Sequence, residues 1–125
     1  MPTAPTLELS GFVLGAPDAR ALAAFYRRLL GWQVRDDQPE WVVLRGPAGG
    51  PTLAFQAEER FEPPVWPADG EHQQMMMHLD IRVDDLEAAV AHAVDCGARV
   101  ADFQPQDHVR VCLDPAGHPF CLYVE

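Results

Sequence analysis

The sequence predicts an α+β fold in which one βαβββ unit occurs twice within a single domain, residues 1–125. Three observations lead to this prediction. Two segments have apolar residues at helical spacing, eight short runs have the composition of strands, and the order of elements in the first half repeats in the second. The first unit spans residues 7–56, a linker spans residues 57–74, and the second unit spans residues 75–125.

Each unit contains one predicted helix. The first is Asp18–Leu30, whose apolar positions repeat every three to four residues and which Gly31 ends. The second is Asp85–Cys96, with the same spacing. Asp84 precedes it by one residue and Glu87 follows three residues later, which resembles a capping box. We therefore expect Asp84 to cap the second helix.

Strands are predicted on both sides of these helices. In the order of the chain they are Leu7–Gly15, Gln33–Asp36, Glu40–Arg45, Thr52–Gln56, Met75–Val83, Arg99–Phe103, Val109–Leu113 and Phe120–Glu125. Glycine and proline punctuate the turns "RGPAGGP" and "DPAGHP" that precede the last strand of each unit.

The repeat also aligns side chains. When Gly11–Asp18 is placed on His78–Asp85, apolar residues coincide at every second position. Because side chains alternate along a strand, these residues share one face of each first strand and should pack under the helices. They are Phe12, Leu14 and Ala16 in the first unit and Leu79, Ile81 and Val83 in the second.

Composition limits the classes of partner. The net charge is −10, and all nine basic residues are dispersed arginines, so binding to nucleic acid is not expected. No apolar run is long enough to span a membrane, and the start of the chain does not resemble a secretory signal. The three cysteines form no close-spaced pair, which favours free thiols in a reducing compartment. We therefore expect a cytoplasmic protein.

The linker carries three prolines and five acidic residues, so it is expected to lack regular structure. It also contains Phe61 and Trp66, two large aromatic side chains. Either these rings hold the linker against the sheet, or they cover the mouth of a pocket.

Three stretches in this order resemble the vicinal oxygen chelate superfamily, which includes glyoxalase I, the bleomycin-resistance proteins and the extradiol dioxygenases. They are "APDARALAAFYRRLLGW" at 16–32, "MHLDIRVDDLEAAVAHAVDCGA" at 77–98 and "LDPAGHPFCLYVE" at 113–125. The resemblance covers almost the whole chain. It implies two curled mixed sheets around a cleft, and often a homodimer.

The resemblance also implies where a metal ligand would stand, namely on the first and last strands of each unit. In the second unit these positions correspond to His78 and Cys121, where the superfamily has histidine or glutamine and then glutamate. In the first unit they correspond to Gly11 and to Leu53 or, in a shifted alignment, Gln56. This set has few oxygen donors for a hard ion, so no catalytic metal is expected. If a divalent metal does bind, its ligands would be Gln56, His78 and Cys121, and imidazole with thiolate would suit zinc.

The run "MHLDIRV" at 77–83 has one polar face, which the resemblance assigns to the cleft. His78, Asp80 and Arg82 alternate with apolar residues, and the resemblance implies that this face points into the cleft. Gly11 opposite His78 is expected to leave room for a ligand. His78 and Asp80 either form a hydrogen-bonded pair that makes the imidazole more basic or serve only to orient the strands. The predicted ligand-binding residues are Trp41, Phe55, Gln56, Trp66, His78, Asp80, Cys121 and Tyr123.

Three functional hypotheses follow. The first is a protein that binds a small organic molecule without a metal, as resistance proteins do by sequestration. The alternative is a metal-dependent lyase, isomerase or dioxygenase in which His78 is a ligand or the catalytic base. The third is an accessory domain that forms a dimer and binds no ligand.

Overall fold

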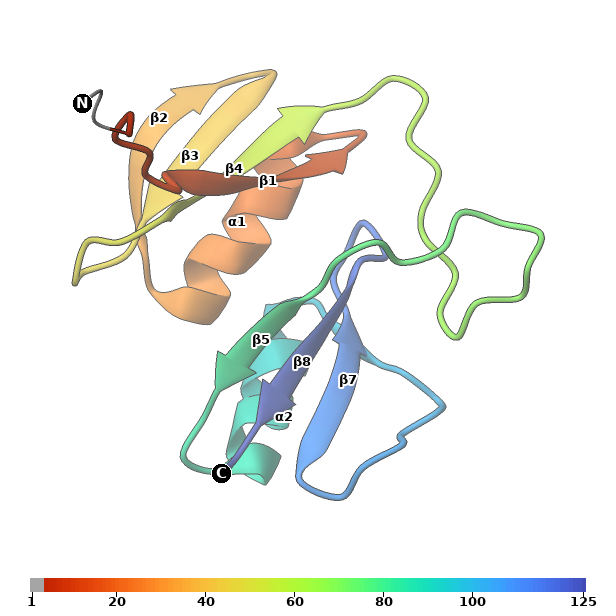
Figure 1. Ribbon diagram of the computed structural model, residues 1–125. Helices are drawn as coiled ribbons and strands as arrows, with labels where there is room; N and C mark the ends of the chain where they lie inside the picture. The colour runs from red at the N-terminus through yellow and green to blue at the C-terminus, as the bar shows by residue number, and fades with distance from the viewer. Residues whose placement is uncertain (1–3) are drawn as a thin grey trace.

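The computed structural model describes residues 4–125. The first unit contains β1 (Gly11–Ala16), α1 (Ala19–Leu30), β2 (Gln33–Gln38), β3 (Trp41–Arg45) and β4 (Thr52–Ala57). The second unit contains β5 (Leu79–Arg82), α2 (Leu86–Cys96), β6 (Arg99–Val100), β7 (Val109–Leu113) and β8 (Pro119–Tyr123). Figure 1 shows one helix packed on each of two separate sheets.

The two sheets have the same topology. Their strand orders are β1-β4-β3-β2 and β5-β8-β7-β6. In each sheet the first strand pairs in parallel with the last, and the other neighbours are antiparallel. The predicted α+β fold with two mixed sheets is therefore confirmed, and the repeat in the sequence is a repeat in backbone connectivity.

Several predicted strand ends are wrong. The strands predicted from Leu7 and from Met75 begin only at Gly11 and Leu79. Pairing explains both differences: β4 and β8 begin at Thr52 and Pro119, so earlier residues have no partner strand, and Leu7 is 88% exposed. Without a ladder, alternation in the sequence does not produce a strand.

The strand predicted at Arg99–Phe103 also stops early, after Val100. Beyond it the side chain of Gln104 takes over the pairing with β7. Its Nε2 donates to the carbonyls of Ala101 and Val111 over 2.8 and 2.9 Å, and its Oε1 accepts from the Val111 amide over 2.9 Å. The Gln104 side-chain amide therefore supplies hydrogen bonds to the backbone of Val111 in β7, beyond the last residue of β6.

Aspartate caps both helices. Asp18 accepts a hydrogen bond from the amide of Ala21, and Asp85 accepts one from the amide of Ala88. The cap of α2 is thus Asp85, one residue after the expected Asp84. Within residues 4–125, neither helix combines the length and hydrophobicity that crossing a bilayer requires.

One hydrophobic core joins the two units. It is centred on four fully buried rings: Phe25 and Tyr26 of α1, Phe55 of β4 and Phe120 of β8. Helix α1 lies on the side of its sheet that faces the second unit (Figure 1), which brings Tyr26 to both sheets. The residues expected under the helices all belong to this core or pack against it: Phe12, Leu14, Ala16, Leu79, Ile81 and Val83.

The linker contains one isolated bridge, between Val65 and Gln74. Its two aromatic rings lie in different places. Phe61 packs against the ring of His118, with centroids 5.4 Å apart, and Trp66 lies near Phe103, with centroids 5.7 Å apart.

Candidate functional site

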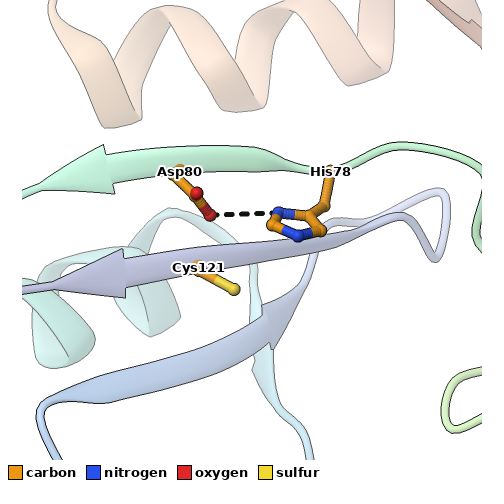
Figure 2. A group of neighbouring side chains, drawn as sticks. All are labelled: His78, Asp80 and Cys121. Atoms are coloured by element: carbon orange, nitrogen blue, oxygen red, sulfur yellow. Dashed lines mark ion pairs between the residues drawn. The ribbon is translucent and has the colours of Figure 1, made fainter.

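His78 and Asp80 form the centre of the candidate site. His78 directly precedes β5, and Asp80 is its second residue, so alternation puts both side chains on one face of the strand. The Nδ1 atom of His78 lies 3.0 Å from the Oδ1 atom of Asp80. Both side chains are partly exposed, and Figure 2 shows them side by side along the strand.

Cys121 completes this cluster from the neighbouring strand. It is the ladder partner of Asp80 in the parallel β5–β8 pair, and Figure 2 shows its thiol on the same face. One donor atom from each of His78, Asp80 and Cys121 lies within 4.8 Å of the others. Burial, and then the negative charge of Asp80, raises the pKa of the Cys121 thiol. The group therefore combines an imidazole, a carboxylate and a thiol that favours its protonated form.

The cluster stands in a hollow of about 360 Å³ on the open face of the second sheet, which we call the concave hollow. It is formed by the linker, the start of the second unit, the loop before β7, and strands β5, β7 and β8. Its walls are mainly apolar, and its polar groups are few. The lining residues are Trp66, Met75, His78, Asp80, Pro105, Gln106, His108, Val109, Val111, Pro119, Cys121 and Tyr123.

Five of the predicted ligand-binding residues meet in this hollow: Trp66, His78, Asp80, Cys121 and Tyr123. The structure therefore gathers residues that are up to 57 positions apart in the sequence, from the linker and from two strands.

Three predicted residues lie on the first sheet instead. Phe55 is fully buried and stacks on Tyr26, with centroids 5.6 Å apart, so its ring forms part of the core and the expected role as a pocket wall is corrected. Trp41 and Gln56 are ladder partners in the β3–β4 pair. The amide of Gln56 donates to Glu58 over 2.7 Å and does not join the His78 cluster.

The strand register also corrects the alignment of the two units. Phe12 pairs with Leu53, and its counterpart Leu79 pairs with Phe120, so Leu53 corresponds to Phe120. The first-unit counterpart of Cys121 is therefore Ala54, which carries no donor atom. Among the residues expected to hold a metal, only those of the second unit stand in a cluster.

Gly11 does not leave the expected space. A Cβ atom on this residue would lie 2.5 Å from the Thr52 Oγ1 and 3.1 Å from the Thr52 carbonyl oxygen. Thr52 is the ladder partner of Gly11, and its hydroxyl donates to the Ser10 carbonyl. The position where the superfamily resemblance places a first-strand ligand is thus filled by a threonine.

Sequence reasoning missed several lining residues, among them Met75, Gln106 and Val111. Val111 could have been predicted from Cys121, because the two are ladder partners and paired residues share a face of the sheet. The loop residue Gln106 carried no periodic signal. Asp80 was predicted as a ligand-binding residue but not as a metal donor.

Comparisons with known proteins agree with this architecture. A family model described as a glyoxalase-like domain matches residues 11–123. No curated protein sequence matches the chain.

Solved structures of similar fold are numerous, and three of them, each less than 25% identical to this chain, show the range of similarity. A glyoxalase/bleomycin resistance protein/dioxygenase family enzyme from Burkholderia phytofirmans is 22% identical, with 94% of this chain and 98% of that chain covered and a TM-score of 0.73. A glyoxalase-related enzyme from Fulvimarina pelagi is 19% identical (96% and 89%, TM-score 0.70). A lactoylglutathione lyase from Agrobacterium tumefaciens is 18% identical (97% and 96%, TM-score 0.63). The resemblance to the vicinal oxygen chelate superfamily is confirmed.

Proposed function

The chain belongs to the glyoxalase-like domain family, and from this premise we propose that it binds a small organic molecule in the concave hollow without a catalytic metal. The observation that carries the proposal is the arrangement of the hollow, in which the His78–Asp80 pair and the Cys121 thiol stand among apolar and aromatic walls. Small-molecule sites commonly combine such walls with a few fixed polar groups.

The lining suggests the class of ligand. Trp66 and Tyr123 both line the hollow with aromatic rings, which favours a planar molecule. Asp80 is a hydrogen-bond acceptor beside them, and the chain carries a net charge of −10. We therefore expect an aromatic molecule with a basic or hydrogen-bond-donating group, held by sequestration rather than converted.

A homodimer is part of this proposal. Gln56 occupies the position in the first sheet that Tyr123 occupies in the second, and Trp41 is its ladder partner. Val13 is 52% exposed on the neighbouring edge strand, and Met76 and Met77 are also exposed. A second copy would cover this apolar surface and would bring Trp41 and Gln56 to the concave hollow of its partner. Size-exclusion chromatography with light scattering tests the dimer.

Ligand binding is tested by thermal shift against a panel of aromatic antibiotics and metabolites. A ligand that binds only the native state raises the melting temperature by mass action. A compound that shifts wild type should shift Tyr123→Ala and His78→Ala much less. His92→Ala is the matched control, since His92 lies on α2 outside the hollow. No shift across the panel, or equal shifts in all variants, contradicts the proposal.

One observation favours a second candidate, a metal-dependent lyase, isomerase or dioxygenase. His78, Asp80 and Cys121 offer three donors within 4.8 Å. Nitrogen, oxygen and sulfur together fit zinc and do not fit Mg²⁺ or Ca²⁺. A bound zinc ion would act as a Lewis acid toward a carbonyl or hydroxyl oxygen of a substrate.

The role of the three side chains in that case is to hold the ion, and the thiol must first lose its proton. Because the pKa of Cys121 is raised, zinc binding would release a proton and weaken as pH falls. Metal analysis of protein purified without chelator separates the candidates. Stoichiometric zinc that is lost in His78→Ala and in Cys121→Ala would replace the metal-free proposal.

A further inference from the structure

A second hollow, also of about 360 Å³, lies between the two sheets, and we call it the inter-unit hollow. The edge strands β1 and β5 form its sides, because these two strands face each other without pairing. Phe12, Leu14 and Leu79 give it apolar walls. His78 and Asp80 line both hollows and so stand on the boundary between them.

The polar groups of the inter-unit hollow come from a buried network. Tyr26 of α1 and His118 of the β7–β8 turn both line it. Both bond to Asp114, whose side chain has no exposed surface: the Tyr26 hydroxyl donates over 2.8 Å and the His118 ring lies 2.9 Å away through Nδ1. The amides of Ala116 and His118 donate to the other carboxylate oxygen over 2.9 and 3.0 Å.

This network selects one tautomer of the neutral His118 ring. A carboxylate only accepts hydrogen bonds, so the proton of the neutral imidazole lies on Nδ1, facing Asp114. The other ring nitrogen, Nε2, is then an acceptor. Within residues 4–125, no side chain or backbone group bonds to Nε2, and the His118 side chain is 16% exposed.

The ring is not needed to satisfy Asp114. Tyr26 and the two backbone amides already donate to both carboxylate oxygens of Asp114. The hydrogen bond that connects α1 to the β7–β8 turn is the one from Tyr26. The effect of the fourth bond is to fix the ring. A histidine held through Nδ1 presents Nε2 in a set direction, and the His118 ring lines the inter-unit hollow while Phe61 packs against it, with centroids 5.4 Å apart.

We propose that the inter-unit hollow is a second binding site, for a hydroxylated aromatic molecule such as a phenol. The hydroxyl donates to Nε2 of His118, and the ring system packs between β1 and β5. The apolar walls favour an uncharged carbon skeleton, and the single oriented acceptor discriminates between a hydroxyl and groups that cannot donate. This site adjoins the concave hollow at His78 and Asp80, and the proposal does not depend on the function proposed for that hollow.

The probes are 2-naphthol, 2-methoxynaphthalene and naphthalene, which share one ring system while only the first can donate a hydrogen bond. Binding is measured by probe fluorescence in titrations of the full chain. Wild type is expected to bind 2-naphthol at least tenfold more tightly than the other two. Equal affinity for the three probes would overturn the proposal.

Variants locate the site. His118→Leu should remove the preference for 2-naphthol. Val13→Trp puts a larger side chain against the hollow and should weaken all three probes, measured at a protein concentration at which light scattering shows the same oligomeric state as wild type. Tyr123 lines only the concave hollow, so in Tyr123→Ala the preference for 2-naphthol over 2-methoxynaphthalene, which depends on His118, should persist. Loss of binding in Tyr123→Ala, with none in Val13→Trp, would overturn the assignment.

His118→Leu also changes the network around Asp114, so a second readout is taken on wild type. The ¹⁵N chemical shift of His118 Nε2 should move on addition of 2-naphthol and stay in place on addition of 2-methoxynaphthalene. An unchanged shift at saturating 2-naphthol would contradict the hydrogen bond. Because Tyr123→Ala separates the two hollows, failure of this proposal leaves the one for the concave hollow standing.

Discussion

Replacing Tyr26 with phenylalanine tests whether one hydrogen bond holds the two units together. The Tyr26 hydroxyl donates to Asp114 over 2.8 Å across 88 positions of sequence, and both residues are buried. Tyr26 belongs to α1 of the first unit, and Asp114 belongs to the turn between β7 and β8 of the second. The phenylalanine variant removes this bond and keeps the ring.

The expected loss is about 2 kcal/mol in the free energy of unfolding, since a net hydrogen bond to a charged group contributes roughly 1.5–3 kcal/mol. No cavity is created, because the ring still packs against Phe25 and Phe55, with centroids 4.8 and 5.6 Å away. Asp114 also keeps three donors. The loss therefore stays below the roughly 3–5 kcal/mol of a buried charge left without a partner.

The assay is urea unfolding followed by tryptophan fluorescence at one fixed protein concentration. With a slope of about 2 kcal/mol per molar urea, the midpoint should fall by about 1 M. The matched control is Tyr123→Phe, since no hydrogen bond of the Tyr123 hydroxyl is present within residues 4–125. We expect a change below about 0.5 kcal/mol there. If Tyr26→Phe and Tyr123→Phe lower the free energy of unfolding by the same small amount, the hydrogen bond from Tyr26 to Asp114 does not hold the units together.

Three further predictions concern caps and titrating groups. Asp85→Ala should lower the free energy of unfolding by about 1 kcal/mol in thermal melts, and Asp84→Ala should change it little, because only Asp85 caps α2. Asp80→Asn should speed the alkylation of Cys121 by iodoacetamide at pH 8, because the charge of Asp80 adds to burial in raising the pKa of the thiol. Mass spectrometry measures the rate of alkylation, and an unchanged rate contradicts this prediction. Burial, and then a neighbouring carboxylate, raises the pKa of Tyr26 well above 10.0. The native state therefore keeps a proton that the unfolded chain releases, so stability should fall above about pH 10 by up to about 1.4 kcal/mol per pH unit, and Tyr26→Phe should lack this component of the slope.

The elements and the core were predictable because they depend on short-range periodicity. Phe12 and Leu14 lie on the core side of β1 for the reason that side chains alternate along a strand. Phe25 and Tyr26 lie on the buried face of α1 because apolar residues recur at helical spacing.

Strand ends and fully buried strands were not predictable in the same way. Leu9 precedes the ladder that begins at Gly11 and has the same parity as Val13, which faces away from the core, so it is 68% exposed and Val13 is 52% exposed. Phe55 stands in the run Leu53–Phe55, which is buried on both faces, so its sequence pattern does not say which face meets the core. Pairing in three dimensions decides both cases.

Part of the candidate site was predictable. His78 and Asp80 share a face by alternation, and Cys121 follows from the superfamily resemblance, which implies a site residue on the last strand. The bond between Tyr26 and Asp114 was not, because no period in the sequence relates a helix of one unit to a turn of the other. Contacts of this kind depend on how the two units dock.

The docking and the strand register together explain why the chemistry gathers in the second unit. The two units share connectivity, yet in the first unit Thr52 fills the space beside Gly11, and Ala54 stands where the second unit has Cys121. In the second unit His78 lies one residue before β5, two positions from Asp80 on the same face, and its Nδ1 atom is 3.0 Å from the Asp80 Oδ1 atom. The first unit instead contributes Tyr26, which anchors Asp114 and with it the turn that carries His118. One copy of the repeat thus supplies the clustered side chains, and the other supplies the hydrogen bond that holds the turn between β7 and β8. A ligand of the concave hollow, which Tyr26 does not line, should for this reason bind less tightly to Tyr26→Phe although it never touches that residue, and its dissociation constant is the quantity to measure.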